Sequence, residues 1–507
     1  RGSWMNIYRD VADKIAAALS ALKDDGTLPR DLDLAGVDIQ EPRDPAHGDM
    51  ASNAAMVLAK RAGQKPRDIA TALAARLEGD GDIDTVEVAG PGFLNIRLTD
   101  ARWRQLVRDV VAAGVAFGAS DLGAGKRAQV EYVSANPTGP MHIGHCRGAV
   151  FGDALANVLE KAGYEVVREY YVNDAGAQVD KLGRTAYLRY REALGEDIGE
   201  IPEGLYPGDY MIPVGQRLAQ SHGDMLMGET EEEYLPITRK VAIEMLLEEI
   251  KADLEKLGVR HDVFFSERSL TEGGTDQVAA AIEVLREKGL IYEGRLPRPK
   301  GHDEDEWEDR DQTLFRSTDF GDDMDRALMK SDGSYTYFAG DVAYHYNKLQ
   351  RGFDLYLNVL GADHVGYIPR LKAAVAALSD GKADFETPVT QLVKVLRDGE
   401  PVRMSKRAGT FVALADVVEE VGRDPVRFMM LMRKHDSQLD FDLAKVVEQS
   451  KDNPVFYVQY AHARIRSVMR RVEALGQDYS DHAVLEDPAE FAVARKIAEW
   501  PRLVEIA

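Results

Sequence analysis

The stretch Ser134–Gly148 constrains the fold of this chain more than any other part of the sequence. It reads Ser-Ala-Asn-Pro-Thr-Gly-Pro-Met-His-Ile-Gly-His-Cys-Arg-Gly. A β-rich run, Gln129–Val133, precedes it, and an amphipathic pattern from about His145 to Lys161 follows it. The prolines and glycines between these runs forbid regular structure. The sequence therefore predicts a strand, a tight loop and a helix start, with His142 and His145 at the mouth of the helix.

The two histidines stand where a phosphate could bind. A helix N-terminus offers free N–H groups and a partial positive charge, and imidazoles there can donate hydrogen bonds to oxygens that gain charge in a transition state. Gly144, Gly148 and Gly152 recur every four residues, so they share a helix face that a flat ring or a sugar could approach closely. Two other interpretations stay open for the histidines alone: helix caps, or a zinc site, for which His-x-x-His is weak evidence.

The composition limits the class of protein. A length of 507 residues allows three or four domains, and no apolar run approaches the roughly 18 residues that a membrane span needs. The single cysteine, Cys146, excludes a disulfide framework, argues against a Cys-rich metal site and predicts a cytoplasmic protein. The net charge of −23 argues against bulk non-specific nucleic-acid binding, but it leaves room for a selective RNA partner at a local basic surface.

Hydrophobic periodicity predicts an α/β chain in three parts. Residues 5–105 read as a small α+β domain. Residues 120–415 read as a Rossmann-like, doubly wound parallel-sheet domain with an insertion at about 183–260, because strand 128–134, helix 145–162 and strand 165–172 form a βαβ unit. A nucleotide would bind at the carboxyl ends of those strands. From Asp424 the pattern reads as all-helical, and residues 416–507 are predicted to form an all-α domain.

A second candidate phosphate element lies far downstream of the first. A strand-like run ends at Leu396, and the segment Val402-Arg-Met-Ser-Lys-Arg-Ala-Gly-Thr410 follows. Arg403, Lys406 and Arg407 place three cations within five residues, beside a glycine. Such a segment could close on a polyphosphate and neutralise charge as pyrophosphate leaves. A solvated basic turn is the alternative interpretation of these cations.

Two surfaces could contact RNA. One is a small basic cluster in the N-terminal domain that includes Lys60 and Arg61, for which a solvated helix end is equally consistent. The other is a predicted helix near the C-terminus, where tyrosines and arginines could bind single-stranded RNA by stacking and charge. Arginines that snorkel along a surface helix explain the second pattern equally well.

Four sequence blocks resemble one family. The Asn-Pro-x-Gly-x-x-His-Ile-Gly-His string resembles the HIGH signature of the class I aminoacyl-tRNA synthetases. The segment Arg403–Lys406 resembles their KMSK signature, with arginine in place of the first lysine. The blocks His47–Asn53 and Gly90–Asn95 resemble the N-terminal additional domain of the arginyl-tRNA synthetases, and Asn453–Tyr460 resembles the start of their helical anticodon-binding domain. The resemblance implies a ligase that activates L-arginine with ATP to arginyl-adenylate and transfers arginine to the 3′ end of its cognate tRNA.

The resemblance also implies a role for each candidate residue. Charge on the reacting phosphates would be stabilised by His142, His145 and Lys406. ATP, accompanied by Mg²⁺ and without a dedicated metal site, would contact Gly144, Gly148, Asn136, Met404, Ser405 and Arg403. Arginine would contact Glu131, Ser134, Asn136, His142, Tyr337, Asp341, Asp363 and His364. The tRNA would contact Lys60, Arg61, Tyr457, Tyr460, Arg464 and Arg466.

The arginine pocket follows a chemical requirement, because a guanidinium group needs fixed carboxylates that match its fork. Taken alone, however, Tyr337 and Asp341 are better explained as a packing tyrosine and a capping aspartate. We also expect a monomer. In the family the anticodon-binding domain continues well beyond the point where this chain stops, so we expect a truncated domain and leave anticodon recognition in doubt. Two alternatives remain: a class I synthetase for another amino acid, and a non-catalytic RNA-binding paralogue.

Overall fold

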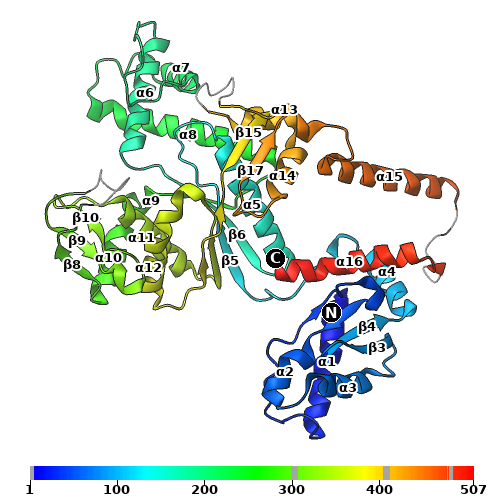
Figure 1. Ribbon diagram of the computed structural model, residues 1–507. Helices are drawn as coiled ribbons and strands as arrows, with labels where there is room; N and C mark the ends of the chain where they lie inside the picture. The colour runs from blue at the N-terminus through cyan, green and yellow to red at the C-terminus, as the bar shows by residue number, and fades with distance from the viewer. Residues whose placement is uncertain (1–4, 299–306, 404–410, 477, 479–483) are drawn as a thin grey trace. The chain divides into compact units, whose positions relative to one another are not determined.

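The computed structural model describes residues 5–298, 307–403, 411–476, 478 and 484–507. It divides into two compact units, whose elements are labelled in Figure 1. The first unit holds the chain up to Ala124 together with Glu160–Tyr164 and Met469–Ala507, and the second holds Gly125–Leu159 and Glu165–Val468. Among these described residues, no helix combines the length and the apolar character needed to span a membrane.

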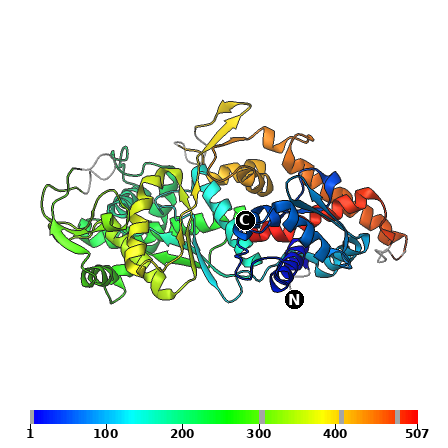
Figure 2. The same cartoon turned by 60° about the horizontal axis from the view of Figure 1, so that its bottom comes forward.

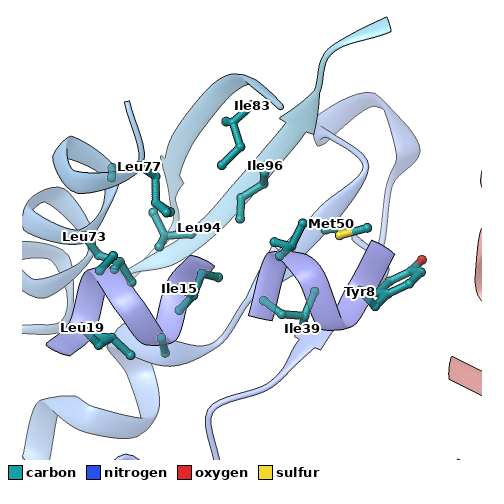
Figure 3. Packing of buried hydrophobic residues seen from close by; sticks show 14 of the residues in the cluster. Tyr8, Ile15, Leu19, Ile39, Met50, Leu73, Leu77, Ile83, Leu94 and Ile96 are labelled. Atoms are coloured by element: carbon teal, nitrogen blue, oxygen red, sulfur yellow. The ribbon is translucent and has the colours of Figure 1, made fainter. Parts of the chain in front are cut away.

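The first unit is an antiparallel sheet covered by helices. The order of its strands is β1-β2-β4-β3. Its elements are α1 (Ile7–Asp24), β1 (Ile39–Gln40), β2 (Met50–Ser52), α2 (Ala54–Ala62), α3 (Pro66–Leu77), β3 (Ile83–Ala89), β4 (Phe93–Leu98), α4 (Asp100–Ala113) and α16 (Pro488–Ile506). Figure 3 shows apolar side chains of α1, α3 and the sheet packed into one core, among them Ile15, Leu73 and Leu94.

The last helix of the chain completes that core. Phe491, Ala494 and Ala498 of α16 recur at helical spacing and are buried in the same cluster as the side chains of α1 and β4. Arg495 on this helix donates from Nε to Asp49 Oδ1 at 2.5 Å. Segments from the two ends of the sequence therefore share one hydrophobic core.

The second unit is built on a parallel sheet with the strand order β13-β11-β5-β6-β7. Its strands are β5 (Arg127–Glu131), β6 (Glu165–Val172), β7 (Val263–Ser266), β11 (Leu355–Asn358) and β13 (Phe385–Glu386). The strand β5 lies in the middle, and its last residue, Glu131, is in register with Glu169 on one side and Asn358 on the other. This arrangement confirms the predicted parallel-sheet fold. The loops that follow these strands meet at one edge of the sheet.

Helices pack around the sheet in separate clusters. The helix α5 (Ile143–Lys161) connects β5 to β6. One apolar cluster joins α10 (Gln277–Glu287), α11 (Tyr337–Arg351) and α12 (Ile368–Ser379). Another joins α6 (Ala177–Ala193), α7 (Ile212–His222) and α8 (Glu231–Leu257), which Figure 1 shows gathered in a helical lobe at the expected position of the insertion.

Shorter elements fill the rest of the second unit. A small antiparallel sheet of order β10-β9-β8 follows the insertion, and β12 pairs with β14. These elements are α9 (Ser269–Glu272), β8 (Ile291–Gly294), β9 (Gln312–Phe315), β10 (Arg326–Met329), β12 (Leu360–Gly361) and β14 (Val389–Thr390).

The end of the second unit contains a third small sheet, of order β16-β15-β17, which the turned view of Figure 2 also shows. Its strands are β15 (Val393–Arg397), β16 (Glu400–Pro401) and β17 (Leu439–Asp442). The helices α13 (Leu414–Val421) and α14 (Arg423–Leu431) lie between them in sequence, and α15 (Pro454–Ala474) follows. The prediction of an all-helical chain from Asp424 is therefore wrong at β17. A strand of four residues alternates too briefly to be recognised from periodicity.

Candidate active site

Two consecutive residues with positive φ end the central strand β5. Val133 has a φ of 71° and Ser134 a φ of 45°, a region that β-branched residues rarely enter. The turn places the Ser134 hydroxyl between two strands: its Oγ donates to Glu131 Oε2 at 3.0 Å and accepts from the main-chain N–H of Tyr171 at 3.0 Å. The backbone at the start of the loop is thus fixed to the sheet edge.

The two signature histidines stack on each other at the start of α5. Their ring centroids are 3.7 Å apart, and the ring planes differ by 23°. The Nδ1 of His142 accepts from the N–H of Gly144 at 3.1 Å, and the Nδ1 of His145 accepts from the N–H of His142 at 3.3 Å. A neutral ring whose Nδ1 accepts carries its proton on Nε2. Both rings therefore present an Nε2–H group as a donor.

Both imidazoles are neutral at physiological pH. Burial lowers the pKa of His142, although the nearby charge of Asp363 opposes that shift. Burial, with smaller contributions from His142 and His364, lowers the pKa of His145 to about 3. The pair is thus suited to donating hydrogen bonds to an oxyanion rather than to forming an ion pair.

The residues that follow the predicted basic segment Val402–Thr410 lie directly against the His142–His145 signature. The N–H of Ile143 donates to the carbonyl of Val412 at 2.9 Å, and the N–H of Leu414 donates to the carbonyl of Met141 at 2.9 Å. These bonds form an antiparallel bridge between His142 and Ala413. The two signature regions, far apart in the sequence, are joined by main-chain hydrogen bonds.

A cavity of about 460 Å³ lies beside His142. Its walls come from β15, from the end of β16 and the residues after it, and from the two segments that the bridge between His142 and Ala413 joins. Among the described residues, they are His142, Ile143, Val393, Lys394, Val395, Pro401, Val402, Arg403, Phe411 and Val412. The cavity is large enough for a nucleotide-sized ligand. Arg403 is exposed on its wall, whereas the predicted contacts Met404, Ser405 and Lys406 lie outside the described residues.

The three glycines of α5 do not serve one purpose. A Cβ on Gly144 would lie 2.8 Å from the His142 ring, so this glycine lets that ring fold back over the helix start. A Cβ on Gly148 would lie 3.7 Å from Thr390 Oγ1, an ordinary contact. A Cβ on Gly152 would lie 2.4 Å from the Tyr132 ring. Gly152 therefore makes room for a buried tyrosine, and the expectation that it helps to form a ligand face is wrong.

The predicted arginine-binding carboxylates, Glu131 and Asp341, lie near the carboxyl end of β5. Glu131 is buried, and its Oε1 accepts from Lys348 Nζ at 2.7 Å. Lys348, itself only 1% exposed, also donates to Asn358 Oδ1 at 2.9 Å. The chain's own ammonium group therefore already engages one oxygen of Glu131, an interaction with no signal in the sequence. Ser134 engages the other oxygen.

Asp341 projects from the first turns of α11 into the same region. Its Oδ2 accepts a short hydrogen bond from the hydroxyl of Tyr367. Burial raises the pKa of Asp341 to about 6, and Glu131 adds to the rise, whereas the Tyr367 hydrogen bond opposes it. A cationic ligand beside Asp341 would stabilise its charged form and lower its pKa.

A further carboxylate, Glu267, belongs to the same acidic cluster. It follows the carboxyl end of β7, and a Cβ on Gly340 of α11 would lie 3.2 Å from its Oε1. Burial first, then the charges of Asp341 and Asp174, raise its pKa to about 8. Sequence reasoning missed Glu267. Its position at the end of a parallel strand was the available signal.

The remaining predicted arginine contacts lie around this pocket. Tyr337 is half exposed, and its ring lies close to where a Cβ on Gly176 would be. Asp363 and His364 are exposed and form a 3.4 Å pair with each other, and their charges act on the histidine pair. Asn136 is also exposed, where its side chain accepts from Asn173 at 2.9 Å and donates to Gln178 at 3.2 Å.

The predicted RNA contacts are exposed on separate elements. Lys60 and Arg61 end α2, and the Arg61 guanidinium donates to the carbonyls of Asp33 and Ala35. Tyr457 and Tyr460, 60% and 53% exposed, lie on α15. Arg464 and Arg466 are exposed on the same helix. All six side chains are thus accessible, and their RNA contacts stay predictions.

Three sequence families match this chain. The family described as the arginyl tRNA synthetase N terminal domain matches residues 9–98. The catalytic domain of class I (R) tRNA synthetases matches residues 107–196. The DALR anticodon binding domain matches residues 458–507.

Full-length similarities agree with these matches. The chain is 58% identical over 519 residues to the arginine--tRNA ligase of Nitrobacter hamburgensis, with 100% of this chain and 87% of that protein covered. It is 59% identical over 517 residues to the arginine--tRNA ligase of Methylobacterium nodulans, with 99% and 88% covered. The Thermus thermophilus arginyl-tRNA synthetase structure has the same fold, with a TM-score of 0.72 at 21% identity over 99% of this chain and 87% of that one.

Proposed function

We propose that this chain, which is a member of the arginyl-tRNA synthetase family, activates L-arginine with ATP and transfers it to the 3′ end of its cognate tRNA. The observation that carries the arginine-specific part is the cluster of three carboxylates, which would form an acidic pocket for the substrate. Glu131 at the end of β5, Asp341 on α11 and Glu267 after β7 lie close enough for their charges to act on one another through Asp341, and β5 is the strand that leads into the histidine pair. A guanidinium group is the substrate feature that such a pocket fits.

The histidine pair acts on the other reactant. The arginine carboxylate oxygen attacks the α-phosphorus of ATP, an O–P bond forms, and the bond to the leaving pyrophosphate breaks. The Nε2–H groups of His142 and His145 donate hydrogen bonds to the phosphate oxygens as their charge rises. Because both rings are neutral, they orient and polarise the α-phosphate. They add no fixed positive charge that would bind the adenylate or the pyrophosphate too tightly.

The cavity beside His142 would hold the nucleotide. Gly144 lets the His142 ring fold back over the helix start, and Arg403 is an exposed residue of the cavity wall. Lys406, with Met404 and Ser405, would contact the departing phosphates. Mg²⁺ would enter with ATP, since this ion usually keeps its waters and binds through substrate phosphates.

The amino acid would bridge the two regions. Asp341 would supply the charge that pairs with the guanidinium, Glu131 and Glu267 would accept hydrogen bonds from it, and Tyr337 would pack against its plane. Ser134 and Asn136 would hold the backbone end of the arginine close to His142. Asp363 and His364, whose charges act on the histidine pair, would face the α-amino group.

In the second step, the terminal ribose hydroxyl of the tRNA attacks the arginyl carbonyl, and AMP leaves. The contacts predicted for Lys60, Arg61, Tyr457, Tyr460, Arg464 and Arg466 would hold the tRNA. The family resemblance further predicts that bound tRNA is needed for efficient activation. A cytoplasmic location, predicted from the single cysteine, and a monomeric state are part of the same proposal and stay predictions.

The decisive experiment is ATP–pyrophosphate exchange with and without the cognate tRNA. Exchange should depend on arginine and should not occur with lysine, glutamine or citrulline, the neutral isostere of arginine. Exchange with one of those in place of arginine would reject the specificity, and no exchange with any amino acid would favour a non-catalytic RNA-binding paralogue.

A lysine variant tests the second signature. Lys406→Ala should slow adenylate formation by about 10²-fold or more while leaving arginine binding intact, because it removes charge from the leaving phosphates only. Lys382→Ala, at an exposed lysine elsewhere in the second unit, is the matched control. An unchanged rate for Lys406→Ala would refute the role.

A further inference from the structure

Arg147 is a buried cation two residues after the second signature histidine. Its side chain is only 1% exposed. Its guanidinium donates to three main-chain carbonyls: from Nη1 to Gln391 at 3.2 Å and to Ser437 at 2.5 Å, and from Nη2 to Lys434 at 2.7 Å. A guanidinium presents its donors in a rigid fork, so three such bonds fix the relative positions of the acceptors.

The three carbonyls lie where two parallel strands begin. Gln391 stands two residues before β15, and Ser437 two residues before β17. The same segments bond to each other, because the N–H of Gln391 donates to the carbonyl of His435 at 2.8 Å and the N–H of Leu439 donates to the carbonyl of Leu392 at 3.2 Å. Arg147 therefore holds the segments that lead into β15 and β17 against α5.

The strand held in this way forms a wall of the cavity beside His142. Val393, Lys394 and Val395 of β15 line that cavity together with His142. The opposite end of the same chain segment is already attached to the histidine region through the bridge at Val412. Gln391 is thus held to α5 by Arg147, and Val412 is held to the first residue of α5 by a main-chain hydrogen bond.

We propose that Arg147 is a positioning residue for the activation step, which sets the separation between His142 and the β15 wall of the nucleotide cavity. The inference rests on the proposed function, because it assumes that the cavity holds ATP. Arg147 itself does not touch the substrate. Its loss would let β15 shift relative to His142, and a displacement of about 1 Å in such a site lowers the rate by about 10²-fold.

A second arginine that bonds to α5, the partly buried Arg427, provides the control. Arg427 of α14 donates from Nη2 to Asp153 Oδ2 of α5 at 2.7 Å and from Nη1 to the carbonyl of Leu257 at 3.2 Å. It also anchors α5, but its partners, Asp153 and Leu257, belong to no strand that lines the cavity. Variants at the two arginines distinguish a general loss of stability from a displacement of β15 relative to His142.

The test compares Arg147→Gln and Arg147→Lys with Arg427→Gln in the full chain. For each variant, kcat and the KM values for ATP and arginine are measured by pyrophosphate exchange with tRNA present, together with the melting temperature. We expect Arg147→Gln to lower kcat by about 10²-fold while the KM for arginine stays within about twofold. Arg147→Lys, which keeps the charge and some donors, should fall between it and wild type. Arg427→Gln should lower the melting temperature but leave kcat within about twofold.

Two results would overturn the proposal: an unchanged kcat for Arg147→Gln, or kcat losses at both arginines that simply follow their melting temperatures. If Arg147→Gln does not fold, the kcat and KM values of Arg147→Lys decide in the same way. A wild-type chain that exchanges only with another amino acid would reject the proposed substrate, yet the comparison of Arg147 with Arg427 would still be made in that reaction.

Discussion

Replacing Asp341 with asparagine tests the arginine pocket at its most informative carboxylate. Asparagine keeps the size of the side chain and one acceptor oxygen, but it removes the charge. In the arginine-free protein Oδ2 of Asp341 accepts from Tyr367, and we expect a substrate guanidinium to bind at Oδ1. A hydrogen bond to a charged group contributes about 1.5–3 kcal/mol. Asp341→Asn should therefore lower kcat/KM for arginine by about 10- to 150-fold.

The pH dependence gives a second readout of the same residue. Because the pKa of Asp341 is raised to about 6, the wild-type kcat/KM for arginine should fall as the pH drops below about 6, where the protonated carboxyl no longer pairs with a cation. Asp341→Asn should lose this acid limb, while Glu283→Gln, at an exposed carboxylate on α10, should keep it. Steady-state pyrophosphate exchange from pH 5 to 8 measures both effects. An unchanged KM for arginine, or an acid limb that survives in Asp341→Asn, would refute the assignment.

The same variant should stabilise the arginine-free protein. A carboxyl whose folded-state pKa is raised favours folding when it is protonated, so its stabilising contribution is present below the usual value of 3.8 and is lost as the pH rises through about 6. At pH 7 and above, asparagine avoids the burial of that charge. We expect Asp341→Asn to raise the free energy of unfolding there by about 1–3 kcal/mol, measured by denaturant titration without arginine. A loss of stability at pH 8 would contradict this.

Three further predictions concern neighbouring groups. His145→Ala should lower kcat by about 10²–10³-fold, and the wild-type pH–rate profile should show no limb from this ring between pH 5 and 8, because its pKa is about 3; a limb in that range that His145→Ala removes would count against a neutral donor. Glu267→Gln should raise the melting temperature most at pH 8 and above and progressively less as the pH falls towards 4.5, since the pKa of this carboxyl is raised to about 8; a gain that grows on acidification would contradict it. Lys348→Met should destabilise the fold by about 3–5 kcal/mol by leaving Glu131 buried and unpaired, and adding Glu131→Gln should recover most of the loss; denaturant curves that show no recovery would refute the pairing.

Local sequence determined the elements whose signals are contained in a short stretch. The strand, loop and helix around Ser134–Gly148 followed from a β-rich run, two prolines and an amphipathic pattern, and the structure has β5, the loop and α5 in that order. The parallel sheet followed from the βαβ pattern and is confirmed by the pairing of β5 with β6. Periodicity failed at β17, where four residues give too short a pattern, and at Gly152, where only the packing of Tyr132 reveals what the missing side chain accommodates.

The assignment of chemistry to the site came from motifs, and its geometry came from tertiary structure. The sequence could propose His142, His145, Glu131 and Asp341, because their residue types and spacing are chemically specific. It could not place Lys348 on Glu131, because an ion pair between residues far apart in the chain leaves no local pattern.

Long-range contact is also what joined the two signatures. Main-chain hydrogen bonds form the bridge between His142 and Ala413, and the Arg147 guanidinium joins the segments that lead into β15 and β17. Both contacts depend on how the whole second unit folds. The sequence by itself determined which groups are available for the reaction. Only the tertiary structure decided their partners, burial and protonation, because those depend on residues that the chain brings together from distant positions.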